Sequence, residues 1–374
     1  MTLAIDLVGT NFESGTKTYN INFCKHLLKQ KFRKKIYIFL TKNYHKELNI
    51  DNPNIIFILK SNYFENTLLR ILWMQLILPF ELKKLKVANF FAPMNICPLF
   101  LKFSKIKITL GLHSNLPWLY FKSMPGNIVK KILIKYFMER SINISDKIIV
   151  CSLYAKKEIK KLLNIRSKKI YPVYLGVDEK LLNRSRNKSY IKNFNYKNYI
   201  FSVISCSRYH NIINLLKAFK SYKVKNKCNL RFLMILQILD KKYFSEIKNF
   251  IKNNFLEKEV IILHNIKNKY LANLYRRASL YVFTSYSEVF GLTSLEAMSQ
   301  KCPVIISNKS ALKEINNNSA LYFDPDKIDE IEYLISKTLK IKNLRKKLIK
   351  KGLYHSRKFS WQTTLSKTQK ILDI

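Results

Sequence analysis

The feature that most constrains this fold is the alternation of short, continuous apolar runs with longer amphipathic stretches along the chain. Continuous apolar strands separated by helices are typical of parallel sheets that are covered on both faces. A first series of expected strands comprises 3–8, 36–40, 55–59, 89–91, 106–110 and 147–151. A second series comprises 200–205, 230–236, 260–263, 280–284 and 304–307. The two series predict two doubly wound α/β halves.

The length of 374 residues also suggests two domains, each large enough for its own core. A polar stretch rich in Asn, Lys and Ser separates the two series, and we expect the linker there, at 183–198. The first domain is then expected over 1–182 and the second over 199–358. Beyond Asp324-Pro325 only helix is expected, and 359–374 is predicted to pack back toward the first domain.

The net charge of +44 leaves nucleic acid, an acidic membrane surface and phosphorylated substrates open as partners. Because 48% of the residues are hydrophobic, a disordered polycation is excluded. The chain is rich in Lys, Ile, Asn, Tyr and Phe and poor in Gly, as an AT-rich genome would produce, so a compositional origin of the charge stays open. No arginine-rich arm, zinc-finger spacing or RNA-binding signature stands out, and no nucleic-acid partner is expected.

Compartment is indicated by the cysteines and by the lack of targeting signals. The six cysteines are far apart and form no CxxC, so we expect reduced, mostly packed thiols. The start of the chain has neither a basic segment nor a long apolar one, so secretion is not expected. The stretch 68–80 is interrupted by Arg70 and Gln75 and is too short to span a bilayer. We expect a cytoplasmic protein for which the membrane is available only as a surface.

The segment 284–314 holds the residues that point most directly to chemistry. A strand is expected to end at Thr284, a loop to turn through Gly291, and a helix to start at about Thr293. A helix start just past the carboxyl end of a parallel strand favours an anion such as phosphate, and Gly291 would let backbone approach a ligand closely. Glu288 would lie in the loop and Glu296 one turn inside the helix.

Both glutamates also have structural interpretations. Thr293-x-x-Glu296 fits a capping box, in which the carboxylate only satisfies the backbone at the helix start. Glu288 could be a solvated loop residue. The residues of this segment alone leave these alternatives open.

Glu288-x7-Glu296, within SEVFGLTSLEAM, resembles the E-x7-E signature of glycosyltransferase family 4, the mannosyltransferase-like group 1 enzymes. SALYFDPDKIDEIEYLI and RKFSW follow in the family's order, and ITLGLHSNLP, DKIIVCSLYAKKEIKKLL and YLGVD precede it. The resemblance covers most of the chain. It implies the GT-B fold, in which two Rossmann-like parallel-sheet domains face a central cleft and a helical segment closes the C-terminus.

The resemblance also implies roles for the residues of the motif. Glu296 would bind the ribose hydroxyls of a nucleotide sugar, and Glu288 the transferred sugar. The segment Phe290, Gly291, Leu292 and Thr293 would meet the diphosphate or the sugar.

Four further positions match the family in part. Arg208 matches a donor-binding arginine, but His210 stands where a lysine is usual, so it would give a hydrogen bond without a full charge. His113 matches a histidine that contacts the donor sugar, although Ser114 follows it instead of Asp; a structural histidine is the alternative. Gly15 corresponds to a glycine loop near the diphosphate. Glu288, His113 and Arg208 are the expected catalytic residues.

Other departures concern glycine and metal. Lys301 stands where the family has a helix-ending glycine, and a left-handed residue other than glycine costs about 1 kcal/mol there. His264 likewise replaces a common glycine. Asp324-Pro325-Asp326 is a D-x-D, a metal motif in another glycosyltransferase fold, but here we expect a turn. No metal or other cofactor is expected.

The resemblance implies retaining, metal-independent transfer of a hexose-type sugar from a GDP- or UDP-linked donor to a glycan hydroxyl, as in bacterial surface polysaccharide or O-antigen synthesis. Arg208 and the helix N-terminus would stabilise charge on the leaving diphosphate, which would help to deprotonate the acceptor. The alternatives are an epimerase-like enzyme of the same fold, or a non-catalytic basic protein that binds membrane or nucleic acid.

A basic amphipathic stretch, 127–140, bears on the acceptor. Ile128, Ile132, Leu133 and Phe137 lie on one side of the expected helix. It is either an ordinary helix packed on its sheet or one whose lysines rest on anionic lipid, at about 1 kcal/mol per close basic residue. We expect a lipid-linked glycan acceptor and a peripheral location on the cytoplasmic face of the inner membrane.

Overall fold

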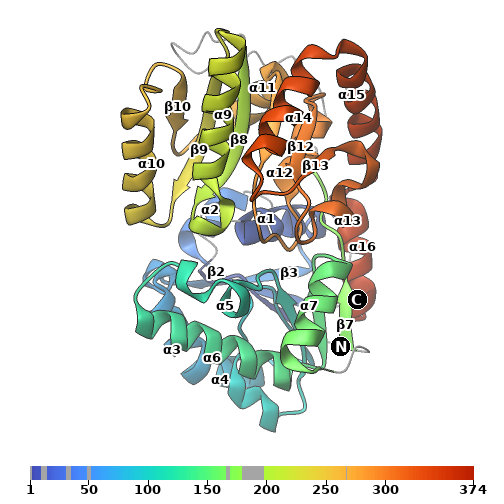
Figure 1. The fold of residues 1–374 in the computed structure, drawn as a ribbon. Helices are drawn as coiled ribbons and strands as arrows, with labels where there is room; N and C mark the ends of the chain where they lie inside the picture. The colour runs from blue at the N-terminus through green and yellow to red at the C-terminus, as the bar shows by residue number, and fades with distance from the viewer. Residues whose placement is uncertain are drawn as a thin grey trace. The chain divides into compact units, whose positions relative to one another are not determined.

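The computed structural model describes residues 2–9, 15–30, 35–48, 52–165, 169–178, 198–266 and 268–374. The chain divides into two compact units (Figure 1). Unit 1 comprises Met1–Phe121, Gly126–Gly176 and Trp361–Ile374, and unit 2 comprises Lys122–Pro125 and Val177–Ser360. The expected linker lies outside the described residues except for Asn198.

The described part of unit 1 forms a parallel sheet in the order β3-β2-β1-β4-β5-β6-β7. The strands are β1 (Leu3–Asp6), β2 (Ile36–Thr41), β3 (Ile55–Lys60), β4 (Asn89–Ala92), β5 (Lys107–Leu112), β6 (Lys147–Val150) and β7 (Ile170–Pro172). The first six confirm the predicted strands to within a residue or two. β7 was not predicted, because it is a three-residue edge strand that ends in a proline.

Helices cover this sheet. They are α1 (Gly15–Leu27), α2 (Lys42–Leu48), α3 (Thr67–Leu76), α4 (Leu78–Lys84), α5 (Leu116–Leu119), α6 (Ile128–Ile144), α7 (Leu153–Leu163) and α16 (Trp361–Leu372), with 3-10 turns η1 (Asn62–Glu65), η2 (Leu99–Phe103) and η3 (Phe121–Ser123). Gly15, expected in a loop, is instead the first residue of α1. In the described residues no helix is long and apolar enough to cross a membrane.

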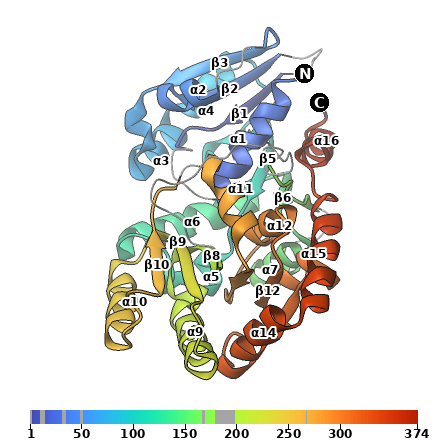
Figure 2. The ribbon, with the colours of Figure 1, turned by 90° about the horizontal axis from the view of Figure 1, so that it is seen from above.

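The last helix, α16, packs in unit 1 beside α1 (Figure 2). The ring of Trp361 lies 5.9 Å from that of Tyr19 in α1. Thr364 Oγ1 donates to the carbonyl of Tyr174 over 2.8 Å, and Lys147 Nζ lies 2.8 Å from a carboxylate oxygen of Asp373. These contacts join the end of the chain to three earlier segments of the same unit.

The described part of unit 2 forms a second parallel sheet, in the order β10-β9-β8-β11-β12-β13. Its strands are β8 (Tyr199–Cys206), β9 (Arg231–Ile238), β10 (Val260–Leu263), β11 (Leu280–Phe283), β12 (Val304–Ser307) and β13 (Leu321–Phe323). Its helices are α9 (Ile212–Asn226), α10 (Lys241–Asn253), α11 (Asn268–Arg277), α12 (Leu292–Ser299), α13 (Leu312–Asn316), α14 (Ile328–Lys340) and α15 (Lys342–Ser356), with 3-10 turns η5 (Arg208–His210) and η6 (Asn317–Ser319). The prediction of helix alone after Asp324-Pro325 is confirmed.

Both sheets are doubly wound, as predicted. In each, the first strand lies between the second and the fourth, so β1 pairs with β2 and β4, and β8 with β9 and β11. Such a reversal of strand order leaves a crevice at the carboxyl ends of the strands, where open α/β sheets bind ligands. The central strands β1, β4, β11 and β12 are buried along their whole length. The six cysteines are free thiols, as predicted, five of them buried.

Candidate active site

In unit 2 the loop from β11 to α12 leaves the sheet at this reversal of strand order. Gly291 has a φ of 82° and is the N-cap of α12. A Cβ at this position would lie 2.5 Å from Cδ2 of Leu312. Glycine therefore permits both the left-handed turn and the close packing that start the helix.

The capping-box alternative for Glu296 is wrong. The helix begins at Leu292, so Thr293 is already inside it and is not the N-cap. The hydroxyl of Thr293 accepts a 2.8 Å hydrogen bond from Tyr281, and Glu296 Oε2 accepts one of 3.0 Å from the hydroxyl of Tyr275. Both side chains thus form hydrogen bonds with neighbouring tyrosines, and neither caps the backbone at the start of the helix.

Glu296 lies in an environment that favours its protonated form. Burial raises the pKa of its carboxyl to about 7, and the nearby carboxylate of Asp178 acts in the same direction. The hydrogen bond from Tyr275 partly opposes this shift. Glu296 is therefore a part-buried hydrogen-bond acceptor whose carboxyl titrates near neutral pH.

Glu288 is not a solvated loop residue either, because its side chain is only 20% exposed. Its backbone is fixed on both sides: its N–H donates to Ser310 Oγ over 3.0 Å, and its carbonyl accepts from the N–H of Ala311 over 3.2 Å. Burial raises the pKa of Glu288 to about 7, with the Ser285 hydroxyl acting in the opposite direction.

His210 lies beside Glu288, at the carboxyl end of β8. Its Nδ1 is 3.6 Å from Glu288 Oε1, and its ring is buried near those of Tyr209, at 4.2 Å, and Phe283, at 5.8 Å. Burial lowers the pKa of His210 to about 3, so the imidazole is neutral at physiological pH. The structure thus brings His210 and Glu288 together without a strong ion pair.

Arg208 faces α10 instead of the loop with Glu288. Its half-exposed guanidinium pairs with Glu246 and lies 5.0 Å from the ring centre of Tyr243. Asn211, three residues further on, has a φ of 54° and donates from Nδ2 to the carbonyl of Pro325 over 2.6 Å.

Asp324-Pro325-Asp326 forms a turn, as predicted. The N–H of Asp326 donates to Asp324 Oδ1 over 3.1 Å, and Lys309 Nζ lies 3.3 Å from Asp324 Oδ2. Asp326 accepts a hydrogen bond from the hydroxyl of Tyr286. Both carboxylates thus serve to fasten loops of unit 2.

In unit 1, His113 directly follows β5. Its backbone N–H donates to Asn95 Oδ1 over 2.6 Å, Nδ1 lies 3.1 Å from Cys151 Sγ, and its ring is 4.4 Å from that of Tyr19. Burial lowers the pKa of His113 to about 4, partly opposed by the backbone of Pro93, so this imidazole is also neutral. Gly15 begins α1, and a Cβ there would meet no atom within 4 Å.

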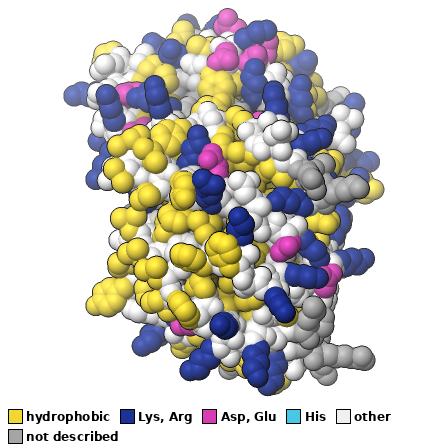
Figure 3. All heavy atoms as spheres, turned by 90° about the horizontal axis from the view of Figure 1, so that it is seen from below, with side chains coloured by type: hydrophobic (Ala, Val, Ile, Leu, Met, Phe, Trp, Pro, Cys, Tyr) yellow, Lys and Arg dark blue, Asp and Glu magenta, His cyan; other side chains and the backbone are white. Residues whose placement is uncertain are grey.

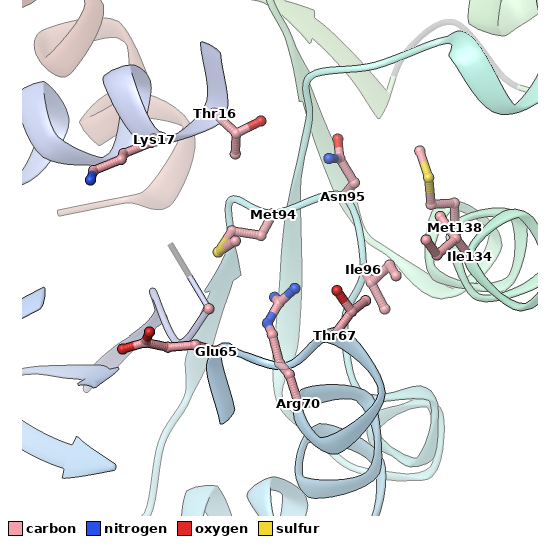
Figure 4. Close-up of a pocket in the computed structure, with 11 residues that line it drawn as sticks. Thr16, Lys17, Glu65, Thr67, Arg70, Met94, Asn95, Ile96, Ile134 and Met138 are labelled. Carbon is pink, nitrogen blue, oxygen red and sulfur yellow. The ribbon is translucent and has the colours of Figure 1, made fainter. Parts of the chain in front are cut away.

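Unit 1 also contains a cavity of about 190 Å³ next to the carboxyl end of β1 (Figure 4). Polar and apolar side chains share its lining: Thr16, Lys17, Glu65, Thr67, Arg70, Met94, Asn95, Ile96, Ile134 and Met138, with Gly9. Arg70 is anchored at its base, with a guanidinium nitrogen 3.3 Å from the buried carboxylate of Asp6. Burial raises the pKa of Asp6, and Arg70 partly opposes that shift.

Several of these residues were not predicted from the sequence. Tyr275 and Asp178 surround Glu296, and Arg70 and Asn95 line the cavity of unit 1. Arg70 could have been found from the sequence, because it is a charged residue within an apolar helical stretch. Such a residue is seldom buried without a partner. Tyr275 belongs to no motif and approaches Glu296 only through the fold.

Sequence profiles of two known domains match the chain and together span both units. The profile described as Glycosyltransferase Family 4 matches residues 14–181, and that described as Glycosyl transferases group 1 matches residues 184–354. The fold and the two matches define a two-domain protein of the GT-B class. The chain belongs to the group 1 glycosyltransferases whose first domain is of the family 4 type.

Relatives of known name agree with this assignment. The chain is 27% identical over 219 residues to O-antigen chain mannosyltransferase RfbU of Salmonella typhimurium, covering 58% of this chain and 57% of the relative. It is 25% identical over 240 residues to O-antigen chain mannosyltransferase B of Escherichia coli, covering 62% of each. The matched part thus spans about three fifths of these relatives.

Anabaena HepE, whose structure was solved with UDP and glucose, has a similar fold. The TM-score is 0.76 at 14% identity, and the match covers 100% of this chain and 99% of HepE.

Proposed function

We propose that this protein transfers a hexose from a nucleotide-diphosphate sugar to a hydroxyl group of a glycan, with retention at the anomeric carbon. Mannose is the first candidate, because the named relatives are mannosyltransferases of O-antigen synthesis. GDP and UDP both remain candidates for the nucleotide, and HepE, of the same fold, was solved with UDP.

The observation that carries the proposal is the pair of part-buried glutamates around the start of α12. Glu296 accepts a hydrogen bond from Tyr275 and does not cap α12. Its carboxylate therefore suits the two adjacent hydroxyls of a ribose. Glu288, at the loop before Gly291, suits a sugar hydroxyl. The N–H groups of Leu292 and Thr293, in the first turn of α12, suit the diphosphate.

Charge on the leaving diphosphate would then be met mainly by Arg208. The neutral His210 offers hydrogen bonding but no charge, since burial keeps its pKa low. Arg208 is half exposed, so it can exchange Glu246 for a phosphate with little rearrangement of the backbone. Stabilisation of this developing charge is the largest catalytic contribution that we assign to the protein.

His113 is assigned a hydrogen bond to the donor sugar, because a neutral imidazole can donate to or accept from a hydroxyl. The leaving phosphate would take the proton of the acceptor hydroxyl, so no protein nucleophile is proposed. We also propose no metal, since Asp324 and Asp326 are engaged in a turn.

The acceptor is assigned to the cavity of unit 1, whose mixture of hydroxyl, amide and methionine side chains suits a sugar ring with polar edges and an apolar face. We propose a glycan acceptor linked to a lipid, used at the cytoplasmic face of the inner membrane.

A panel of nucleotide sugars tests the donor half. One donor, with GDP-mannose the first candidate, should raise the melting temperature and be consumed when an acceptor glycan is added. Glu296→Ala should abolish the thermal shift and lower transfer at least about 100-fold, because a charged hydrogen-bond acceptor is lost. Glu257→Ala, at an exposed glutamate of unit 2, is the matched control and should change neither.

Other results would refute the proposal. If no nucleotide sugar stabilises the protein and it binds nucleic acid with a steep salt dependence, the chain is a binding protein. If it converts a nucleotide sugar to its epimer without transfer to any glycan, the epimerase-like alternative holds.

A further inference from the structure

Helix α3 departs from the usual arrangement of a surface helix, because it is apolar on both sides. Its inner side buries Ile71, Trp73 and Met74. Its two polar interior residues point inward: Arg70 to Asp6, and Gln75 to the backbone of Cys97 and Leu99, at 3.1 and 2.8 Å. Leucines four residues apart point outward instead, with Leu68, Leu72 and Leu76 exposed by 47%, 55% and 57%. A helix on the surface of a water-soluble domain normally turns its polar side outward.

The exposed apolar surface continues onto neighbouring elements. Hydrogen bonds join α3 to η2 through Gln75 and Leu99, and the segment before η2 to α6 through the N–H of Cys97 and Ser141 Oγ. We call the following exposed side chains the apolar face: Leu68, Leu69, Leu72 and Leu76 of α3; Ile77 between α3 and α4; Phe80 of α4; Phe100 and Phe103 of η2; Ile128, Val129, Ile132 and Tyr136 of α6. Figure 3 shows hydrophobic side chains gathered on this side of unit 1.

This arrangement corrects the expectation for 127–140. Ile128 and Ile132, expected to share an apolar side with Leu133 and Phe137, are 59% and 55% exposed, and the buried residues of α6 are Met138, Ser141 and Ile142. The ordinary packing of that apolar side on the sheet therefore does not hold for the first half of the helix.

Exposed lysines accompany the apolar face. Lys83 and Lys84 end α4, and Lys102 and Lys105 lie in and after η2. The acids near these elements have partners: Glu81 pairs with Lys60, and Glu139 accepts from the indole N–H of Trp118 over 2.9 Å. The uncompensated charge beside the apolar face is therefore positive.

We propose that the apolar face is a membrane-docking surface, which rests on an anionic bilayer with its leucine and phenylalanine side chains at the boundary between headgroups and acyl chains. Apolar side chains flanked by lysines are the composition that such a surface binds. A second copy of the chain fits less well, because a two-fold interface would place the same lysines against one another.

The apolar face lies on the same helices as the proposed acceptor cavity. The choice of a lipid partner rests on the proposed function. α3 and α6 contribute Thr67, Arg70, Ile134 and Met138 to the acceptor cavity, so the same two helices bear the docking surface and line the cavity. A second cavity, of about 330 Å³, includes Ile132 and Tyr136 of the apolar face. An acceptor whose lipid lies in the bilayer could thus present its glycan to unit 1.

Flotation with lipid vesicles tests the docking surface without donor or acceptor. The wild-type protein should float with vesicles of phosphatidylglycerol and phosphatidylcholine, and much less with phosphatidylcholine alone. The double variant Phe80→Ser/Phe103→Ser should lower the partition coefficient at least about tenfold, because the two side chains are 74% and 83% exposed and free to insert. Phe255→Ser is the matched control, since Phe255 of unit 2 is 86% exposed and should not matter.

Equal flotation of the wild type and the double variant would overturn the proposal. A second outcome would also overturn it: sedimentation without lipid shows that the wild type is a dimer and that the double variant is a monomer. The apolar face would then join two copies of the chain. Leu72→Ser, on a different element, provides an independent variant. Transfer to a water-soluble acceptor should persist in the double variant; if flotation behaves as expected but no transfer occurs, the proposed function fails and the docking surface stands.

Discussion

Unit 1 and unit 2 share one architecture, a parallel sheet covered by helices, but they place polar side chains in opposite ways. In unit 1, α3 buries Arg70 and Gln75 and exposes leucines. In unit 2, α10 buries Tyr243, Ile247 and Ile251 and exposes its lysines.

The exposed apolar side chains of the two units also differ in how they are distributed. Val224, Tyr333 and Tyr354 lie on three different helices and Phe255 lies in the loop after α10, whereas Ile238 and Leu239 form one adjacent pair. Single exposed apolar residues are ordinary, whereas a gathered set marks an interaction site. An overall composition of 48% hydrophobic residues hides this difference, which is visible only when each helix is assigned its inner and outer side.

The largest effect on stability should come from breaking the buried ion pair of unit 1, and breaking the exposed ion pair of unit 2 gives the comparison. Arg70→Met leaves the buried Asp6 without a partner and should lower the free energy of unfolding by about 3–5 kcal/mol. Arg208→Met, in the exposed pair with Glu246, should cost less than about 1 kcal/mol. Urea unfolding of both variants measures the difference, and adding Asp6→Asn to Arg70→Met should restore part of the loss. Equal costs would show that the interior of unit 1 tolerates an unpaired charge.

A second effect, of intermediate size, should appear in the pH dependence of unit 2. Because the pKa of Glu296 is raised to about 7 in the folded state, the folded protein keeps a proton that the unfolded chain loses above its ordinary pKa of 4.5. The favourable contribution is thus complete below pH 4.5 and is lost as the pH rises through about 7.

Glu296→Gln, which cannot ionise, should therefore stabilise the protein at pH 8 by on the order of 2 kcal/mol and leave it unchanged near pH 4.5. Melting temperatures across this range test the sign. A variant that is destabilised at pH 8 would mean that the carboxylate is well solvated or paired in the folded state.

The smallest effect should be the same in both units. Lys86 in unit 1 and Lys301 in unit 2 have φ values of 50° and 62°, in the left-handed region that favours glycine. Lys86→Gly and Lys301→Gly should each raise stability by about 0.5–1 kcal/mol, which calorimetry would detect as a rise of about 2 °C. A gain in only one unit would show that the other lysine makes compensating contacts.

Most of the fold could be predicted from the sequence, because buried parallel strands are continuous apolar runs. The three-residue edge strands β7 and β13 were missed, since so short a run has no period. The left-handed backbone expected at Lys301, where the family has a glycine, was confirmed. His264 also stands where the family has a glycine, but there the positive φ belongs to the next residue, Asn265.

The candidate site was predictable in its motif but less so in its contacts. The E-x7-E spacing located Glu288 and Glu296 at the loop and first turns of α12, and the capping box failed because the helix starts one residue earlier than expected. The partners of Glu296 come from α11 and from Asp178, which only the fold brings near. The outward leucines of α3 were unreadable, because periodicity gives the sides of a helix but not which side meets the sheet.

The packing of α16 against α1 also determines the order in which the protein is completed during synthesis. Residues 177–360, nearly all of unit 2, leave the ribosome as one uninterrupted stretch and can fold as soon as they emerge. Unit 1 is begun first but stays one helix short, with Tyr19 lacking its contact to Trp361, until residues 361–374 are made. The unit that is begun first is therefore completed after the unit that follows it.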